Sequence, residues 1–161
     1  MDAETTLHYR RALGCFPTGV VIVTAQDPDG PVGLVVNSFT SVSLAPPLVL
    51  FCLGDHSDRG VFFRTAERYV INILSAEAEG LAAKYASRGR HRIVVEDLQL
   101  ASEGLPALKG ALTRLMCRVH QRVKLADHLA IVGEVERFET DDGDALTYFR
   151  GRYGRAQTPE S

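Results

Sequence analysis

The sequence predicts a mainly β protein with short helices, built as a closed or nearly closed antiparallel barrel. About six or seven short apolar segments are rich in β-branched residues, as strands are. Turn residues at 27–31 join two of these segments as a hairpin, which favours antiparallel pairing. Strands and helices do not alternate regularly along the chain, as they would in a doubly wound parallel sheet.

The first part of the chain predicts one helix and one hairpin. Thr5 or Thr6 can cap a short helix that Gly14 ends. Residues 20–25 have the apolar, β-branched character of a strand, and residues 32–36 return as its hairpin partner. The turn between them is rich in aspartate, proline and glycine, which are typical turn residues.

The rest of the chain alternates between strands and small helices. Residues 48–53 are too short and too apolar for an amphipathic helix and are therefore expected to form a buried strand. Residues 1–155 are expected to form one domain, followed by a loose C-terminal tail at 156–161. Further strands are expected at 69–74, 115–123, 129–135 and 146–153, and helices at 58–66 and 75–85.

Composition excludes several classes of protein. The 161 residues are 45% hydrophobic and 24% charged, with a formal net charge of −2, so neither nucleic acid nor an anionic membrane is expected as a partner. Cys15, Cys52 and Cys117 are odd in number and widely spaced, which disfavours a disulfide framework or a metal site. No apolar run approaches the roughly 20 residues that cross a bilayer. The expected location is the cytoplasm, because the cysteine usage suits a reducing compartment and the N-terminus is acidic.

A polar segment between two apolar ones carries the most information about function. Residues 37–43 contain an asparagine, three serines and a threonine, and Pro46 and Pro47 follow them. Such a segment can present backbone N–H groups and short polar side chains to a flat ligand. An ordinary strand–turn–strand connection with polar turn residues explains the same pattern.

Five blocks of sequence identify a family. They are 16–24 (FPTGVVIVT), 37–43 (NSFTSVS), 46–50 (PPLVL), 127–135 with its Asp-His pair, and 148–153 (YFRGRY). In this order, across residues 8–153, they resemble the flavin reductase family with the FMN-binding split-barrel fold. The resemblance implies a homodimeric Greek-key barrel that binds FMN or FAD near the subunit interface. It further implies that NADH or NADPH reduces the flavin, commonly to supply a partner flavin-dependent monooxygenase.

The resemblance also implies which residues bind the flavin. Backbone and hydroxyl donors in residues 37–43 would bind the pyrimidine edge of the flavin ring and stabilise the negative charge that develops on it during reduction. Cys52 is explained equally well as a small core residue, and a reactive thiol is not expected there. The implied flavin-binding residues are Leu34, Val35, Val36, Asn37, Ser38, Ser41, Val42, Ser43, Cys52 and Leu53.

The expected phosphate-binding segment departs from the family pattern. Relatives have a cluster of serines or threonines that leads into a helix, whereas here only Ser57 offers a hydroxyl and Asp58 is expected to cap its own helix. Val35 likewise stands where the family often has a threonine. Arginines can compensate for the missing hydroxyls through bidentate contacts with the phosphate. The candidates are Arg59, Arg88, Arg90 and Arg92.

His128 is the candidate for contact with the nicotinamide nucleotide. It lies on the polar face of its predicted strand, and the neighbouring Asp127 can orient its ring. Arg150 and Tyr153 are expected to close the same cleft, although a strand end with solvated arginines explains them equally well. Hydride transfer depends mainly on positioning, which agrees with the lack of an obvious nucleophile and base pair in the sequence.

Two other functions remain open at this point. A flavoprotein with the same barrel could retain FMN and oxidise or rearrange a small organic substrate. A non-catalytic flavin-binding or partner-docking module is the other alternative, and Val35 and Asp58 favour it.

Overall fold

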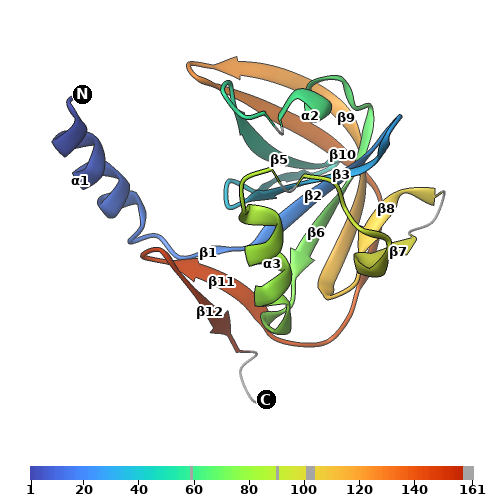
Figure 1. The fold of residues 1–161 in the computed structure, drawn as a ribbon. Helices are drawn as coiled ribbons and strands as arrows, with labels where there is room; N and C mark the ends of the chain where they lie inside the picture. The colour runs from blue at the N-terminus through green and yellow to red at the C-terminus, as the bar shows by residue number, and fades with distance from the viewer. Residues whose placement is uncertain (59, 90, 101–103, 158–161) are drawn as a thin grey trace.

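The computed structural model describes residues 1–58, 60–89, 91–100 and 104–157. Within these residues, a seven-stranded antiparallel sheet curls into a barrel in the order β3-β2-β6-β9-β10-β5-β4 (Figure 1). This confirms the predicted mainly β antiparallel fold with short helices. The strands are β2 (Val21–Asp27), β3 (Gly30–Val36), β4 (Thr40–Leu44), β5 (Pro47–Gly54), β6 (Arg68–Leu74), β9 (Ala111–Leu125) and β10 (His128–Thr140).

Smaller elements surround the barrel. One small sheet consists of β1 (Thr18–Gly19), β11 (Ala145–Phe149) and β12 (Arg152–Ala156). A second one consists of β7 (Leu98–Leu100) and β8 (Pro106–Leu108). The helices are α1 (Ala3–Leu13), α2 (Gly60–Thr65) and α3 (Glu79–Ala86), with 3₁₀ turns η1 (Ala76–Ala78) and η2 (Val95–Asp97). No helix in the described part of the chain has the length and apolar character that crossing a membrane requires.

Apolar side chains fill the barrel and also cover one side of it. Inside, the Phe51 ring meets Tyr69 and Phe63 edge-on, at centroid distances of 5.3 and 6.2 Å. Outside, Ile22 packs in a second cluster that includes Tyr85 of α3. The central strand β2 is therefore buried on both faces, which explains its continuous apolar sequence.

A buried asparagine joins three parts of the core. The side-chain nitrogen of Asn72 donates to the Ile22 carbonyl at 2.9 Å and to the Thr24 hydroxyl at 3.0 Å. Its side-chain oxygen accepts the Leu108 N–H at 2.9 Å, and the Thr24 hydroxyl donates to the Pro106 carbonyl. These bonds attach β8 to the barrel and satisfy polar groups that would otherwise be unpaired in the interior.

Two details of the predicted strands are wrong. The segment 146–153 is a hairpin rather than one strand, because Arg150 and Gly151 adopt φ values of 48° and 81° and form a turn between β11 and β12. In the predicted strand 115–123, Met116 alternates with apolar residues in the same register as Arg118 and His120, which predicts a position on the polar face. It is instead buried against a small cluster that includes Leu105 and Ala107. Ala107 belongs to β8, a strand that the sequence did not predict.

The cap of the first helix is also wrong. Asp2 caps α1, since its carboxylate accepts the Thr5 N–H at 2.7 Å, while the Thr6 hydroxyl donates to the Asp2 carbonyl at 2.8 Å. Thr5 and Thr6 thus lie inside the helix, which begins earlier than expected. No residue of α1 is buried, and the helix stands away from the barrel (Figure 1).

Replacement of Gly133 is expected to destabilise the fold. A Cβ at this position would overlap the hydroxyl of the buried Tyr69, so Gly133→Ala should lower the free energy of unfolding by about 2 kcal/mol. Tyr69→Phe removes that hydroxyl, which has no hydrogen-bond partner among the described residues, and should recover part of the loss in the double variant. Urea denaturation measures both effects. Strictly additive losses would contradict this explanation.

Candidate functional site

A recess with a volume of about 240 Å³ opens where β3 and β5 end. It brings together residues from three segments that are distant in sequence, namely 34–38, 52–57 and His128. Sequence reasoning predicts all of them except Gly54. The recess is lined by Leu34, Val35, Val36, Asn37, Ser38, Cys52, Leu53, Gly54, Ser57 and His128.

The side chain of Ser38 joins the segment after β3 to β5, on the two sides of the recess. The hydroxyl of Ser38 accepts the Cys52 N–H at 3.0 Å and donates to the Cys52 carbonyl at 3.4 Å. The backbone ladder between β4 and β5 reaches only as far as the pairing of Thr40 with Leu50. Ser38 thus continues the pairing beyond the ladder and fixes the segment after β3 against β5.

His128 starts β10 directly opposite Gly54. Its Nδ1 lies 2.9 Å from a carboxylate oxygen of Asp127, the partner that the sequence predicts. This hydrogen bond lowers the pKa of Asp127. A Cβ on Gly54 would lie 3.8 Å from Nε2, so the other ring nitrogen is close to the end of β5. The ring is thus oriented through one nitrogen, and the other remains beside the recess.

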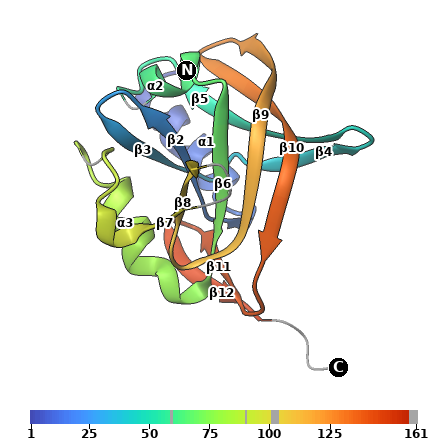
Figure 2. The same cartoon turned by 90° about the vertical axis from the view of Figure 1, so that its right-hand side faces the viewer.

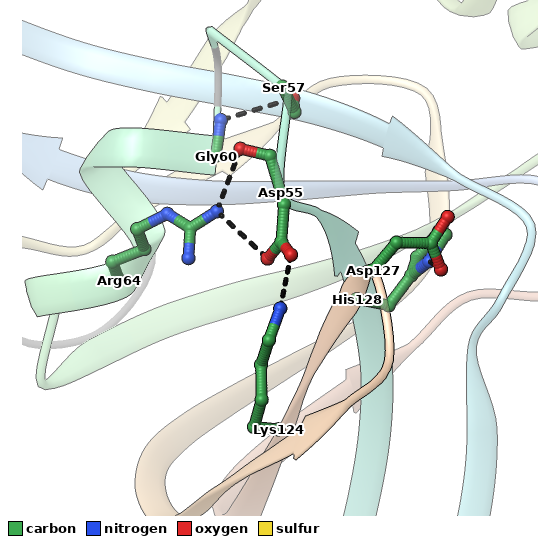
Figure 3. Close-up of polar contacts among 7 residues, drawn as sticks. All are labelled: Asp55, Ser57, Gly60, Arg64, Lys124, Asp127 and His128. Atoms are coloured by element: carbon green, nitrogen blue, oxygen red, sulfur yellow. Dashed lines mark hydrogen bonds and ion pairs between the residues drawn. The ribbon is translucent and has the colours of Figure 1, made fainter.

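An ionic cluster around Asp55 supports this arrangement (Figure 3). The carboxylate of Asp55 pairs with Lys124 and, at 3.7 Å, with Arg64; the Lys124 hydrogen bond lowers the pKa of Asp55. The Asp55 N–H also donates to the Asp127 carbonyl at 2.9 Å. One residue therefore ties the loop after β5 to α2 and to the β9–β10 turn. Sequence reasoning missed it, because its partners are remote in the chain.

Ser57 lies three residues before the first residue of α2, Gly60. Its hydroxyl accepts the Gly60 N–H at 3.2 Å (Figure 3). The hydroxyl is thereby held at the rim of the recess. Of the arginines predicted to lie near a phosphate, Arg59 and Arg90 fall outside the described residues.

Arg92 lies apart from the recess. Its guanidinium pairs with Asp27 at 2.7 Å and with Asp29 at 3.6 Å, at the turn between β2 and β3. It also stacks over the Phe62 ring, 5.0 Å from the centroid. The structure therefore gives Arg92 a role in holding this hairpin, and its charge is already balanced by carboxylates.

Ser41, Val42 and Ser43 also lie outside the lining of the recess. They belong to β4, at the outer edge of the sheet, where the β4–β5 hairpin projects from the barrel (Figure 2). A bulge interrupts the pairing between Ser41 and Ser43, and the Ser43 hydroxyl donates to the Pro46 carbonyl. The polar segment of the sequence is thus divided, with Asn37 and Ser38 at the recess and β4 beyond it.

Two further hollows adjoin the recess through Asn37. One, of about 220 Å³, is lined by Val35, Val36, Tyr148 and Tyr153 among others. The other, of about 770 Å³, reaches Ser38, Tyr148 and Arg150. The predicted Tyr153 and Arg150 therefore border neighbouring spaces. Sequence reasoning missed Tyr148, although it lies within the YFRGRY block.

The residues around these spaces fit a flavin. Val35, Val36 and Leu53 supply apolar walls, while the Asn37 amide and the His128 imidazole supply polar groups at the edge. A flat heterocycle with a hydrogen-bonding rim requires this combination. Within the described residues, no group of three or more histidine, cysteine or acidic side chains is arranged to hold a metal.

The comparisons with known proteins agree with this geometry. Residues 13–157 match the family model "Flavin reductase like domain". The chain is 43% identical to the FMN reductase (NADH) SmoA of Agrobacterium fabrum over 154 residues, which cover 94% of this chain and 87% of that protein. It is 34% identical over 146 residues to the reductase component of 4-nitrophenol 4-monooxygenase/4-nitrocatechol 2-monooxygenase of Rhodococcus opacus, covering 91% and 78%.

A solved structure has the same fold over nearly the whole chain. It is the NADH:FAD oxidoreductase SgcE6 of Streptomyces globisporus C-1027, in complex with NAD and FAD fragments. The TM-score is 0.88 at 32% identity, over 97% of this chain and 95% of that one. With the family model, these matches establish that the chain belongs to the flavin reductase like domain family.

Proposed function

We propose that this chain is an NADH-dependent flavin reductase that passes a hydride from NADH to N5 of FMN or FAD and supplies reduced flavin to a separate monooxygenase. The observation that carries this proposal is the position of Asn37, which borders three adjoining hollows. They provide room for a flavin ring and for a hydride donor beside it. The names of the relatives, which are NADH-dependent reductases and reductase components of monooxygenases, support it further.

The residues of the recess act by positioning. A bound flavin supplies the hydride-accepting atom, N5, and the two-electron chemistry. Val35, Val36 and Leu53 exclude water from one part of the recess, and Ser38 is fixed by its bonds to Cys52. His128, oriented by Asp127, is the proposed contact for the nicotinamide nucleotide. Holding two rings at near-attack distance accounts for much of such a rate enhancement.

We also propose that the protein is a homodimer. Tyr9 and Leu13 lie four residues apart on α1, and their side chains are 52% and 55% exposed. No residue of the helix is buried within its own chain, and Phe16, just after it, is 75% exposed. A second copy of the chain that packs on this face would remove the apolar surface from water.

The cysteines support the proposed cytoplasmic location. Cys15, Cys52 and Cys117 are free thiols in the structure. Burial raises the pKa of Cys117 to about 12, so this thiol is not a nucleophile at neutral pH. Free thiols are typical of proteins in a reducing compartment.

Purified protein is expected to oxidise NADH in the presence of excess FMN or FAD and, without oxygen, to bleach the flavin absorbance. Turnover should be faster with NADH than with NADPH. Steady-state assays of the four donor and flavin combinations test this.

Absence of turnover in all four would reject a flavin reductase. A yellow protein that survives dialysis and consumes little NADH would indicate a flavoprotein that retains FMN, and stabilisation by flavin without reduction would indicate a binding module.

His128→Ala is expected to lower kcat/KM for NADH about ten-fold, because the loss of one oriented hydrogen bond is worth roughly 1.4 kcal/mol. The KM for flavin should rise less than the KM for NADH, because His128 is the proposed contact of the nicotinamide nucleotide. His120→Ala, at an exposed position of β9, is the matched control and should keep the activity of the unaltered protein. Equal activity of the two variants would remove His128 from the site.

The dimer should be visible by size-exclusion chromatography with light scattering. Leu13→Asp is expected to shift the protein toward the monomer, because it buries an unpaired charge in the proposed interface. Leu125→Asp, at a position of similar exposure (52%) at the end of β9, should remain dimeric. A monomeric unaltered protein at micromolar concentration would argue against the homodimer.

A further inference from the structure

Three arginine side chains border one hollow at the C-terminal end of α1. This hollow, of about 470 Å³, is lined by Arg10, Arg11, Gly14, Cys15, Arg150 and Gly151. The two segments that form it are fixed to each other, since the Arg150 N–H donates to the Gly14 carbonyl at 2.9 Å. The turn between β11 and β12 therefore places the Arg150 guanidinium beside the last turn of α1.

The charges at this hollow are not balanced by the chain itself. Within the described residues, no carboxylate forms an ion pair with Arg10, Arg11 or Arg150. The side chain of Arg150 instead lies 3.6 Å from the Cys15 sulfur and over the Phe149 ring. Other arginines of the chain do pair with carboxylates; they are Arg64, Arg68, Arg92, Arg114, Arg118, Arg122 and Arg155.

The helix end explains only part of this cluster. Arg10 and Arg11 lie in the last turn of α1, where positive charge favours the helix macrodipole. Arg150 belongs to another element, and its approach adds repulsion between like charges that an anion would offset. Guanidinium groups match phosphate oxygens in particular, because their planar donors bind two oxygens at once.

The hollow is continuous with the proposed active site. It shares Arg10, Gly14, Arg150 and Gly151 with the hollow of about 770 Å³, which extends to Asn37 and Ser38 at the recess. The wall of that larger hollow also contains the buried hydroxyl of Thr18, which has no hydrogen-bond partner in the described part of the chain. A ligand oxygen would satisfy this hydroxyl.

We propose that Arg10, Arg11 and Arg150 bind the diphosphate of a dinucleotide whose reacting ring lies at the recess. The inference rests on the proposed function, since it places that ring beside Asn37 and Ser38. Two substrates of the reaction carry such a diphosphate, namely NADH and FAD. FMN has a single phosphate, and reduced nicotinamide riboside has none, so the four compounds separate the two sources.

The double variant Arg10→Gln/Arg11→Gln tests this proposal by steady-state kinetics with each donor and each flavin. If the diphosphate is that of NADH, the KM for NADH should rise at least about ten-fold with both flavins, while the KM for reduced nicotinamide riboside stays constant. If it is that of FAD, the KM of FAD should rise by a similar factor and that of FMN should not. Either pattern supports the site and identifies its ligand.

Unchanged KM values for all four compounds would overturn the inference, as would an equal loss with every compound, which indicates a structural role. Arg137→Gln removes one positive charge from an exposed position on β10 and should change none of the constants. In the unaltered protein the affected KM should also rise with salt, and in the double variant it should rise less steeply. A change in oligomeric state of the double variant would instead assign the arginines to a subunit contact.

The two proposals fail in different ways. If the unaltered protein reduces no flavin with any donor, the proposed function is wrong, and the assignment of this hollow to a dinucleotide falls with it. If the unaltered protein is active and the double variant has the same constants, only the diphosphate site is wrong.

Discussion

The hydrogen bonds between Ser38 and Cys52 hold together the two edges on which the site depends. β3 and β4 are the outer strands of the main sheet, and the chain between them has to turn from one to the other beside β5. The backbone pairing of β4 with β5 ends at Thr40 and Leu50. Beyond that point the Ser38 hydroxyl takes the place of a strand partner for Cys52. Apolar walls from β3 and β5 then face one space, with Asn37 at its edge.

Much of the fold could be predicted from local sequence. The apolar runs of β2, β5 and β6 and the turn at 27–31 specify strands without knowledge of their partners. The elements that were missed are short or depend on remote contacts. β8 is held by Asn72, more than thirty residues away in the chain, and no local pattern indicates that bond. The hairpin of β11 and β12 was missed because Arg150 tolerates a positive φ that sequence reasoning assigns first to glycine or asparagine.

The candidate site could be predicted in part, and the reason for the limit is physical. Asn37, Cys52 and His128 lie at strand ends, and the family pattern gives their positions in the chain directly. Arg92 was assigned to a phosphate because only its charge was visible in the sequence; the structure shows that Asp27 binds that charge. Residue type indicates what a side chain can bind, and the fold decides whether another residue binds it first.

The connection between β9 and β10 has two residues, Ala126 and Asp127, and it sets the register of His128. Neighbouring side chains in a strand point to opposite faces, so an insertion of one residue here would turn the imidazole away from Gly54. Ala126 already adopts φ of 49° without being glycine. A change in the length of this connection would therefore separate His128 from the recess, whereas Ala126 shows that its first position accepts a side chain.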